Sequence, residues 1–222
     1  MRMLTKRKRR RLIASVAVAV LLCVLAPFMG AWLRDSGLMA ARETALLERL
    51  SSLPQSAKDF AAVCAGLFSV QGSVGIMAVL SAVEYRRVRS WRTLVRELVT
   101  AAGPMVYVTA AKWIVDRPRP STGLLSPYLP DDPSFPSGHT AAAVIVGVML
   151  VLMSRGTRLR RVMPMLAVAL VAAVGASRLM LGVHFPTDVL TSMVVCPSIS
   201  YAIWQVLTSR GVLRKVRRMV RV

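Results

Sequence analysis

Residue types that build many enzyme sites are scarce in this chain. Its 222 residues include 10 Asp and Glu against 30 Lys and Arg, with two His and three Cys. The acidic residues show no cluster with the spacing of metal ligands, which disfavours a calcium or magnesium site. We therefore expect neither a metal nor another cofactor.

The three cysteines, Cys23, Cys64 and Cys196, all fall within apolar runs. A thiol in such a run usually packs as a small hydrophobe, so we expect no disulfide and no metal ligation. Internal repeats and low-complexity linkers are also lacking. Their absence predicts a single membrane-embedded domain over residues 1–222.

Apolar residues dominate the composition. Hydrophobic residues make up 55% of the chain and the mean hydropathy is +0.55, far above the usual values for a soluble domain. A helix needs about 20 apolar residues to cross a bilayer core about 30 Å thick, and six segments approach that length. They predict an all-α integral membrane bundle of six helices at Leu12–Leu33, Phe60–Val83, Leu94–Val115, His139–Ser154, Met163–Val183 and Leu190–Thr208.

The basic residues lie in alternate connections between these segments. Residues 2–11, 86–96, 155–161 and 210–221 hold 22 of the 30 Lys and Arg, and the only acidic residues that border them closely are Glu84 and Glu97. By the positive-inside rule, the basic N-terminus (1–11) and the basic tail (209–222) are cytoplasmic. The formal charge of +20 therefore indicates orientation and contact with anionic membrane lipids, and not nucleic-acid binding.

Two further segments flank the first span. The basic start and apolar run could form a signal peptide, but the run is long and lacks a small-x-small cleavage site, which favours a retained helix. In the connection 34–59, leucines recur at helical spacing between charged residues. This pattern predicts an additional helix in the membrane interface, and covering of the bundle explains its leucines better than entry into lipid.

Polar residues that are distant in sequence share one predicted depth. Lys112 ends the third span, residues 136–139 precede the fourth, and Arg178 ends the fifth. His184 and Asp188 fall in the connection before the sixth span. All of them are predicted at the extracytoplasmic face, and their common depth is difficult to explain by solvation alone.

This combination of side chains suits phosphate chemistry. Lys112, Arg119 and Arg178 supply positive charge, and the guanidinium forks match phosphate oxygens. The start of a helix at Gly138 presents unpaired amide groups and the positive end of the helix dipole. Of the two histidines, His139 and His184, one can attack phosphorus while the other protonates the leaving oxygen.

Three stretches carry a family resemblance. "KWIVDRPRP" (Lys112–Pro120), "PSGH" (Pro136–His139) and "SRLMLGVHFPTD" (Ser177–Asp188) resemble, in order and spacing, the three signature motifs of the type 2 phosphatidic acid phosphatase superfamily. The spacing of six residues after the lysine selects Arg119 as the motif arginine. Arg117 is left as a further cation beside the site.

The resemblance implies a role for each motif residue. His184 would be the nucleophile that forms a phosphohistidine, Asp188 would orient it, and His139 would be the acid for the leaving group. No metal would be needed. The residues that would hold the phosphate are Lys112, Arg119, Ser137, Gly138 and Arg178.

These features favour a lipid phosphatase of the bacterial inner membrane that acts on a lipid phosphate or diphosphate at the outer leaflet. Polyprenyl (undecaprenyl or decaprenyl) diphosphate is the preferred substrate, because the short six-span plan resembles enzymes that recycle this carrier. Phosphatidylglycerol phosphate and phosphatidic acid remain alternatives. So do a phosphotransferase with an acceptor other than water and a non-catalytic protein that binds or transports anionic lipid.

Overall fold

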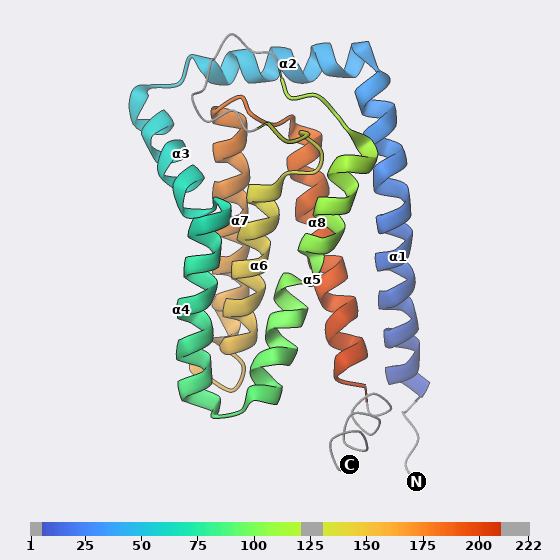
Figure 1. The fold of residues 1–222 in the computed structure, drawn as a ribbon, viewed down its shortest axis with the longest axis vertical. Helices are drawn as coiled ribbons and strands as arrows, with labels where there is room; N and C mark the ends of the chain where they lie inside the picture. Colours follow the sequence, from blue (N-terminus) through green and yellow to red (C-terminus); the bar gives the residue numbers. More distant parts are fainter. Residues whose placement is uncertain (1–5, 121–130, 210–222) are drawn as a thin grey trace.

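The structure, a computed structural model, describes residues 6–120 and 131–209. Helices account for its regular structure, and no strand occurs in these two ranges (Figure 1). The prediction of an all-α fold is confirmed. The elements in chain order are α1 (Lys6–Asp35), α2 (Gly37–Ser51), α3 (Gln55–Leu67), α4 (Val70–Val88), α5 (Trp91–Val115), α6 (Gly138–Met153), the 3-10 helix η1 (Arg158–Arg161), α7 (Met163–Met180) and α8 (Pro186–Leu207).

The count of membrane spans is confirmed only in part. Four helices, α1, α5, α7 and α8, are long and apolar enough to cross a membrane alone, and α3 with α4 would make a fifth span. The sixth predicted span corresponds to α6, whose 16 residues make it shorter than the others. The fold is that of a multi-pass membrane protein.

The second predicted span, Phe60–Val83, is not one straight helix. It is divided between α3 and α4, which meet at an angle of 64°. Ser69 caps the start of α4 by accepting a hydrogen bond from the Gly72 amide at 3.1 Å. A Cβ atom on Gly72 would lie 2.4 Å from the carbonyl oxygens of Gly66 and Leu67. The bend therefore depends on glycine, which hydropathy does not report.

Helix α6 is enclosed by protein and not by lipid. Every residue from 140 to 147 is buried, and α6 packs against α4, α5, α7 and α8. Three alanines and Gly147 provide the close approach, because a Cβ on Gly147 would lie only 3.1 Å from the Cβ of Ala167 in α7. A buried central helix does not need the full length of a lipid-exposed span, which explains why α6 can be short.

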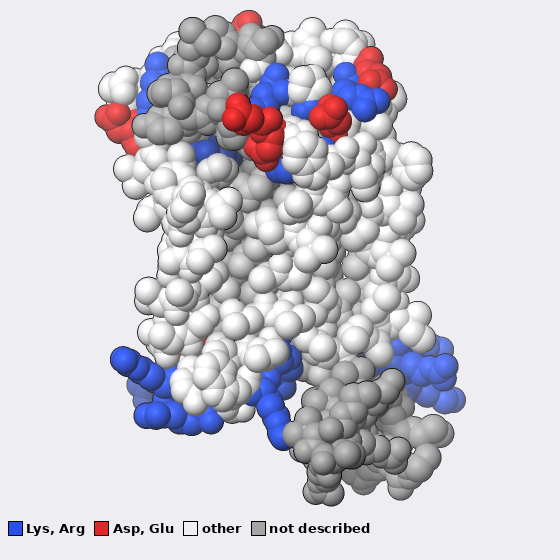
Figure 2. Space-filling model, viewed as in Figure 1, with Lys and Arg blue, Asp and Glu red and all other residues white. Residues whose placement is uncertain are grey.

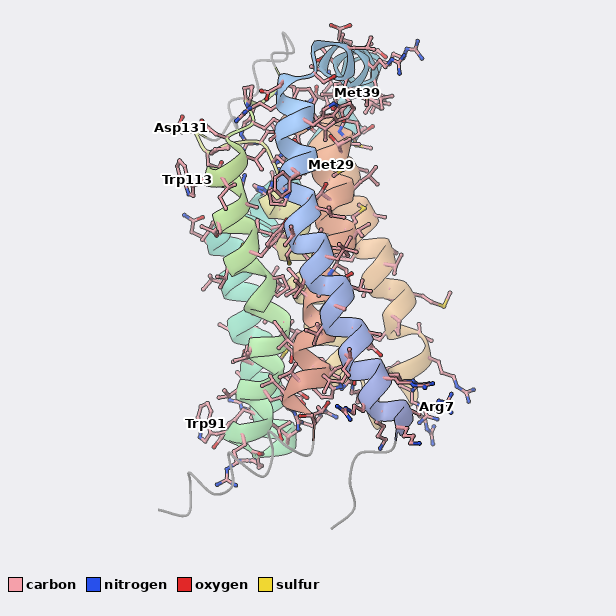
Figure 3. The ribbon with its side chains drawn as sticks, turned by 90° about the vertical axis from the view of Figure 1, so that its right-hand side faces the viewer. Arg7, Met29, Met39, Trp91, Trp113 and Asp131 are labelled. Carbon is pink, nitrogen blue, oxygen red and sulfur yellow. The ribbon has the colours of Figure 1, made fainter. Side chains whose placement is uncertain are left out.

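Charge separates the two ends of the bundle. Figure 2 shows Lys and Arg gathered at the end where α1 begins, mixed charges at the opposite end, and an uncharged belt between them. Arg7 and Trp91 mark the basic end, while Met39, Trp113 and Asp131 lie at the other end (Figure 3). Most of the predicted basic tail (209–222) and the first part of the basic N-terminus lie outside the described residues.

Helix α2 lies across the mixed-charge end of the bundle (Figure 1). Its side chain cap is Ser36, which accepts a hydrogen bond from the Met39 amide at 3.4 Å. Leu47 is completely buried, and Glu43, one turn earlier on the same face, is 7% exposed. The connection 34–59 thus contains a helix, and this face of it covers the bundle.

Candidate active site

The sequence-predicted site residues come together beneath α2. The last turn of α5 carries Lys112, the start of α6 carries Gly138 and His139, and the last turn of α7 carries Arg178. These helix ends all lie at the same end of the bundle (Figure 1). One detail differs from the prediction: Asp188 lies in the first turn of α8 and not in the connection before it. Its place in that turn lets its carboxylate accept the Phe185 amide at 3.0 Å.

His184 and Asp188 are linked through a serine that the motifs do not include. Nδ1 of His184 lies 3.3 Å from the Ser134 hydroxyl and 3.6 Å from Oδ2 of Asp188. The Ser134 hydroxyl in turn donates a short hydrogen bond to the same Oδ2. His184 is 1% exposed and Asp188 is fully buried. The shorter route from the imidazole to the carboxylate therefore passes through Ser134.

The other nitrogen of His184 faces a cation. Nε2 lies 3.2 Å from Nη1 of Arg119, which also donates to the Val183 carbonyl at 2.7 Å. A guanidinium only donates, so Nε2 must accept, and the ring proton belongs on Nδ1, toward Asp188. This tautomer leaves the lone pair of Nε2 directed at the cations, where a phosphate would bind.

Burial keeps the imidazole of His184 neutral. It lowers the pKa of His184 from 6.5 to about 4, with the charge of Arg119 acting in the same direction and the neighbouring Asp188 acting against it. At neutral pH the ring is therefore unprotonated on Nε2. That is the form required of a nucleophile.

Two of the predicted phosphate-binding cations share one carboxylate. Asp132 accepts from Nζ of Lys112 at 2.8 Å and from Nη2 of Arg119 at 2.7 Å. Burial acts to raise the pKa of Asp132, but the hydrogen bond and charge of Lys112, joined by those of Arg119, hold it below its usual value. The Lys112 ammonium also donates a short hydrogen bond to the Pro133 carbonyl. The carboxylate thus stands against these cations as a phosphate oxygen would.

The start of α6 is tied to α8. Ser137 is the N-cap of α6, its amide donates to the Asp188 carbonyl at 3.2 Å, and its own carbonyl accepts from Ser192 at 2.9 Å. A Cβ on Gly138 would lie 3.7 Å from Cε of Lys112, so the first amides of α6 are next to the lysine stem. These contacts hold the positive end of the α6 dipole against the cluster around His184.

Arg178 and His139 occupy the side of the site that faces α3. The guanidinium of Arg178 donates to the Ala61 carbonyl at 3.1 Å and to the Ser177 hydroxyl at 3.2 Å. It is 2% exposed. His139 lies close to the Arg178 guanidinium and the His184 ring, and it forms a hydrogen bond with the backbone of Ala65 in α3. The structure therefore gathers both histidines and all three predicted cations.

Two linked ion pairs connect Asp188 to α2 through Arg117 and Glu43. Nη1 of Arg117 donates to Oδ1 of Asp188, and Nη2 donates to Oε2 of Glu43, both at 2.7 Å. The other oxygen of Glu43 accepts from the amide and the hydroxyl of Thr187, at 2.9 and 2.8 Å. Arg117 also lies over the ring of Phe185, with its Cζ 4.0 Å from the centroid. Helix α2 is thereby connected to the carboxylate beside His184.

The arrangement agrees with a known family. The model of the PAP2 superfamily matches residues 93–211, which include every motif residue named above. This chain belongs to the PAP2 superfamily. The family resemblance predicted from the three motifs is confirmed.

Two curated PAP2 relatives and one solved structure extend the comparison. The decaprenylphosphoryl-5-phosphoribose phosphatases of Mycobacterium tuberculosis strains CDC 1551 / Oshkosh and H37Rv are each 33% identical over 167 residues, which is 70% of this chain and 80% of theirs. The crystal structure of a transmembrane PAP2 type phosphatidylglycerolphosphate phosphatase from Bacillus subtilis matches with a TM-score of 0.70 at 20% identity. It covers 90% of this chain and 98% of that one. The solved structure supports the fold, and the family identifies a membrane lipid phosphatase that hydrolyses a phosphate ester.

Three residues of this PAP2 site lie outside the motifs. Ser134 and Asp132 precede the "PSGH" stretch, and no sequence pattern distinguishes them from other loop residues. A weak sequence pattern indicates that Glu43 is buried, because it stands four residues before Leu47 on the leucine face of the predicted interfacial helix. A carboxylate on the buried face of such a helix requires a partner, and Arg117, noted only as a further cation, is that partner.

Proposed function

We propose that this chain is a metal-independent phosphatase of polyprenyl-linked phosphates, acting through a phosphohistidine on His184. The observation that carries the proposal is the orientation of this imidazole. Its Nδ1 faces Ser134 and Asp188, and its Nε2 presents a lone pair toward Arg119. An oriented, neutral nucleophile beside fixed cations is what phosphoryl transfer requires.

In the first step, Nε2 of His184 attacks phosphorus, and the bond from phosphorus to the leaving oxygen breaks. His139, which is protonated when the substrate phosphate is bound, gives this proton to that oxygen as the alcohol departs and becomes neutral. In the second step, His139 accepts a proton from water, the hydroxide oxygen attacks phosphorus, and the bond to Nε2 breaks. Inorganic phosphate leaves, and both histidines return to their starting protonation states.

The cations stabilise charge on the phosphoryl oxygens during both steps. Lys112 and Arg119 approach from one side and Arg178 from the other, while the amides at Gly138 and His139 have no partner within α6 and can donate to phosphate. Three fixed positive charges supply the stabilisation that a bound cation provides in other phosphoryl-transfer enzymes.

Arg117 and Glu43 are positioning residues in this mechanism. Neither reaches Nε2, but Arg117 holds Oδ1 of Asp188, and Glu43 holds both Arg117 and the first turn of α8. All three charged groups are less than 8% exposed. The buried chain from α2 therefore sets the place of the carboxylate that orients His184.

The named relatives favour a phosphomonoester carried on a polyprenyl-linked sugar, because they are phosphatases of decaprenylphosphoryl-5-phosphoribose. Polyprenyl diphosphate, the substrate preferred from the sequence, is the second candidate. Both place one terminal phosphate at a membrane boundary while the prenyl chain remains in hydrocarbon. Phosphatidylglycerol phosphate and phosphatidic acid would present the same group on acyl chains.

We infer that the chain crosses the membrane six times, with α3 and α4 together as one span, α2 in the outer interface and the site at the extracytoplasmic face. The basic end, where α1 begins and α8 ends, would then be cytoplasmic by the positive-inside rule. Lipid-facing positions on α1, α5 and α7 support a membrane-embedded belt, since Phe28, Val106 and Met165 are 71 to 77% exposed.

Phosphate release by the purified protein tests the proposal. We expect release from decaprenylphosphoryl-5-phosphoribose and from decaprenyl diphosphate that survives EDTA and is inhibited by vanadate. His184→Ala should abolish release and the acid-labile phosphoenzyme. His139→Ala should slow the reaction by about 100- to 10,000-fold, and less for a substrate with a better leaving group.

Three outcomes would contradict parts of this mechanism. A phosphoenzyme that persists in His184→Ala would exclude this histidine as nucleophile, and loss of activity in EDTA would exclude the metal-independent route. Wild-type protein that binds these lipids and releases no phosphate would indicate a non-catalytic binder. Phosphate recovered on another lipid or sugar, and not as inorganic phosphate, would indicate a phosphotransferase.

A further inference from the structure

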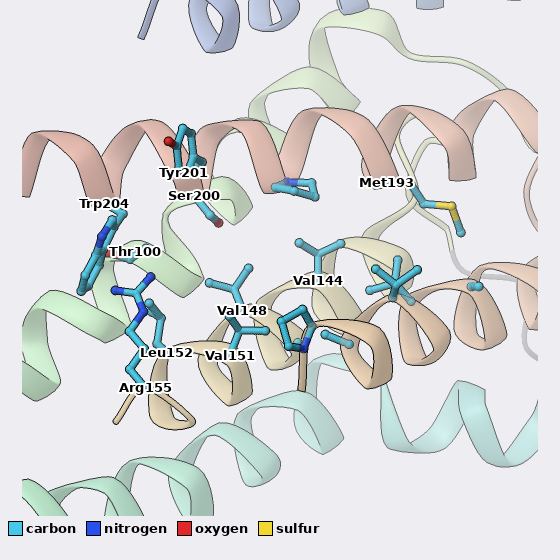
Figure 4. Close-up of a pocket in the computed structure, with 17 residues that line it drawn as sticks. Thr100, Val144, Val148, Val151, Leu152, Arg155, Met193, Ser200, Tyr201 and Trp204 are labelled. Carbon is cyan, nitrogen blue, oxygen red and sulfur yellow. The ribbon is translucent and has the colours of Figure 1, made fainter. Parts of the chain in front are cut away.

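An apolar groove lies in the half of the bundle nearer its basic end, and none of the motif residues lines it. It lies between α7 and α8, is floored by α6, and has a volume of about 390 Å³ (Figure 4). Its walls are almost entirely apolar, with Val144, Val148 and Val151 along the floor. Ser200, whose buried hydroxyl has no partner among the described residues, is one of its few polar groups.

The groove spans about half of a bilayer. On α8 it extends from Met193 to Trp204, which at 1.5 Å per residue is about 16 Å. Along α6 and the turn that follows it, the groove extends over a similar length, from Val144 to Arg155. One leaflet contributes about 15 Å of the hydrocarbon core. The groove therefore matches the hydrocarbon depth of the single leaflet at the basic end.

The opposite end of the groove, at Met193, is closed toward the residues around His184. A Cβ on Gly175 would lie 2.4 Å from the terminal methyl of Met193 and 2.8 Å from a methyl of Val189. Helices α7 and α8 are therefore in close contact at this level, between the groove and the start of α6. A chain lying in the groove does not continue to His139 or His184.

The mouth of the groove, at the basic end of the bundle, carries two arginines without an ion-pair partner among the described residues. Cζ of Arg155 lies over the ring of Trp204, 3.7 Å from its centroid, and the guanidinium makes no hydrogen bond or ion pair with the described residues. Arg96 lies 5.0 Å from the same ring, and its buried Nε has no partner there either. The buried carboxyl group of Glu97 lies close enough to act on the charge of Arg155, but it forms no ion pair with either arginine among the described residues. The donors that remain suit an anionic headgroup.

We propose that the groove is a binding site for one anionic phospholipid of the leaflet at the basic end. Its phosphate accepts hydrogen bonds from Arg155 and Arg96 beside Trp204, and one acyl chain lies between α7 and α8 up to Met193. The match between groove length and leaflet depth, the apolar walls and the free donors at the mouth support this occupant. The closed end at Met193 distinguishes it from the hydrocarbon tail of the substrate.

Lipid binding measured by native mass spectrometry on the full-length protein tests the headgroup contact. The probes are phosphatidylglycerol and phosphatidylcholine with identical acyl chains. We expect the first phosphatidylglycerol to bind about fivefold more tightly, the effect of one unit charge near the surface. Arg155→Gln should remove this preference. Arg160→Gln removes the same charge from an exposed site at the same end of the bundle and should retain it.

A second pair of variants tests the groove itself. Ala172 is exposed and lines the groove, so Ala172→Phe should fill it from the lipid side and lower the affinity for the first lipid by about tenfold or more. Ala169 is also exposed on α7 but does not line the groove, so Ala169→Phe is the matched control. Phosphate release should be unchanged in both.

The proposal would be overturned by equal affinities for the two lipids in wild-type protein, or by Arg155→Gln behaving like Arg160→Gln. It would also fail if Ala172→Phe raised the KM for long-chain substrate while phosphatidylglycerol still bound normally. That result would assign the groove to the substrate tail. Failure of catalysis in wild-type protein would leave these lipid affinities unaffected, so the two proposals can be distinguished.

Discussion

If Lys112 and Arg119 hold phosphate as proposed, Asp132 competes with it for these two cations. Its carboxylate accepts from Lys112 at 2.8 Å and from Arg119 at 2.7 Å, the groups expected to hold the phosphoryl oxygens. A phosphate that binds both cations must displace it. Replacing Asp132 by Asn keeps the size of the side chain and removes the charge, so the variant should bind inorganic phosphate and vanadate more tightly than wild-type protein.

The size of the effect follows from the exposure of the pair. The side chain of Asp132 is 40% exposed, while those of Lys112 and Arg119 are 10% and 8% exposed. Because water screens the carboxylate, the interaction energy of each ion pair should be about 1 kcal/mol, the upper end of the range for surface ion pairs. Loss of both competing pairs is then about 1 to 2 kcal/mol, which corresponds to about 5- to 30-fold tighter inhibition.

The assay is the inhibition constant of inorganic phosphate against lipid hydrolysis. Asp131→Asn is the matched control, because Asp131 adjoins Asp132, has an exposed side chain and carries the same charge. Asp132→Asn should lower the inhibition constant by the stated factor and Asp131→Asn should change it little. An inhibition constant that rises in Asp132→Asn would refute the reasoning, since it would mean that the carboxylate holds the cations in place for phosphate.

Three other predictions concern the pH dependence, the support of Asp188 and the packing of α1. Because the pKa of His184 is about 4, kcat/KM corrected for substrate ionisation should show no acid limb near 6.5, and such a limb would contradict a buried neutral ring. The free energy of unfolding should fall as the pH drops from about 6.5 to 4, because in this range only the unfolded chain takes up the proton of His184. Glu43→Gln should slow the burst of phosphoenzyme formation by about tenfold or more, with Glu48→Gln as control; a reduced burst amplitude at unchanged rate would indicate a purely structural role. Gly30→Ala should lower the Tm in detergent, because its Cβ would lie 2.7 Å from the Phe135 ring, at a cost of about 1 to 3 kcal/mol; Gly37→Ala, with open space around it, is the control, and equal Tm values would contradict the packing.

Hydropathy located the helices and was less informative about their path. The runs that predicted the first, third and sixth spans correspond to α1, α5 and α8. The predicted second span is bent by 64° at residues 68–69, because Gly72 packs against the carbonyls of Gly66 and Leu67. Hydropathy measures the apolar character of a segment and is the same for a straight and a bent helix.

The sequence predicted where the motif residues lie better than it predicted which other residues contact them. Lys112, Arg119, His139 and His184 stand at helix ends or in the connections between helices, so the alternation of spans was enough to assign them to one face. Glu43 contacts a residue 74 positions away in sequence, through the crossing of α2 over the bundle. No local pattern encodes that crossing, so its partner could not be predicted.

The amino-acid sequence by itself determined the family, the helical membrane architecture and the end of the bundle at which the motif residues lie. In a chain that crosses a slab of constant thickness, position along each apolar run converts directly into depth. Only the tertiary structure decided which side chains at that depth touch: Ser134 between His184 and Asp188, Asp132 across two cations, and Arg117 beneath α2. Lateral neighbours depend on how helices pack and cross, and that depends on small residues and shape complementarity distributed over the whole chain.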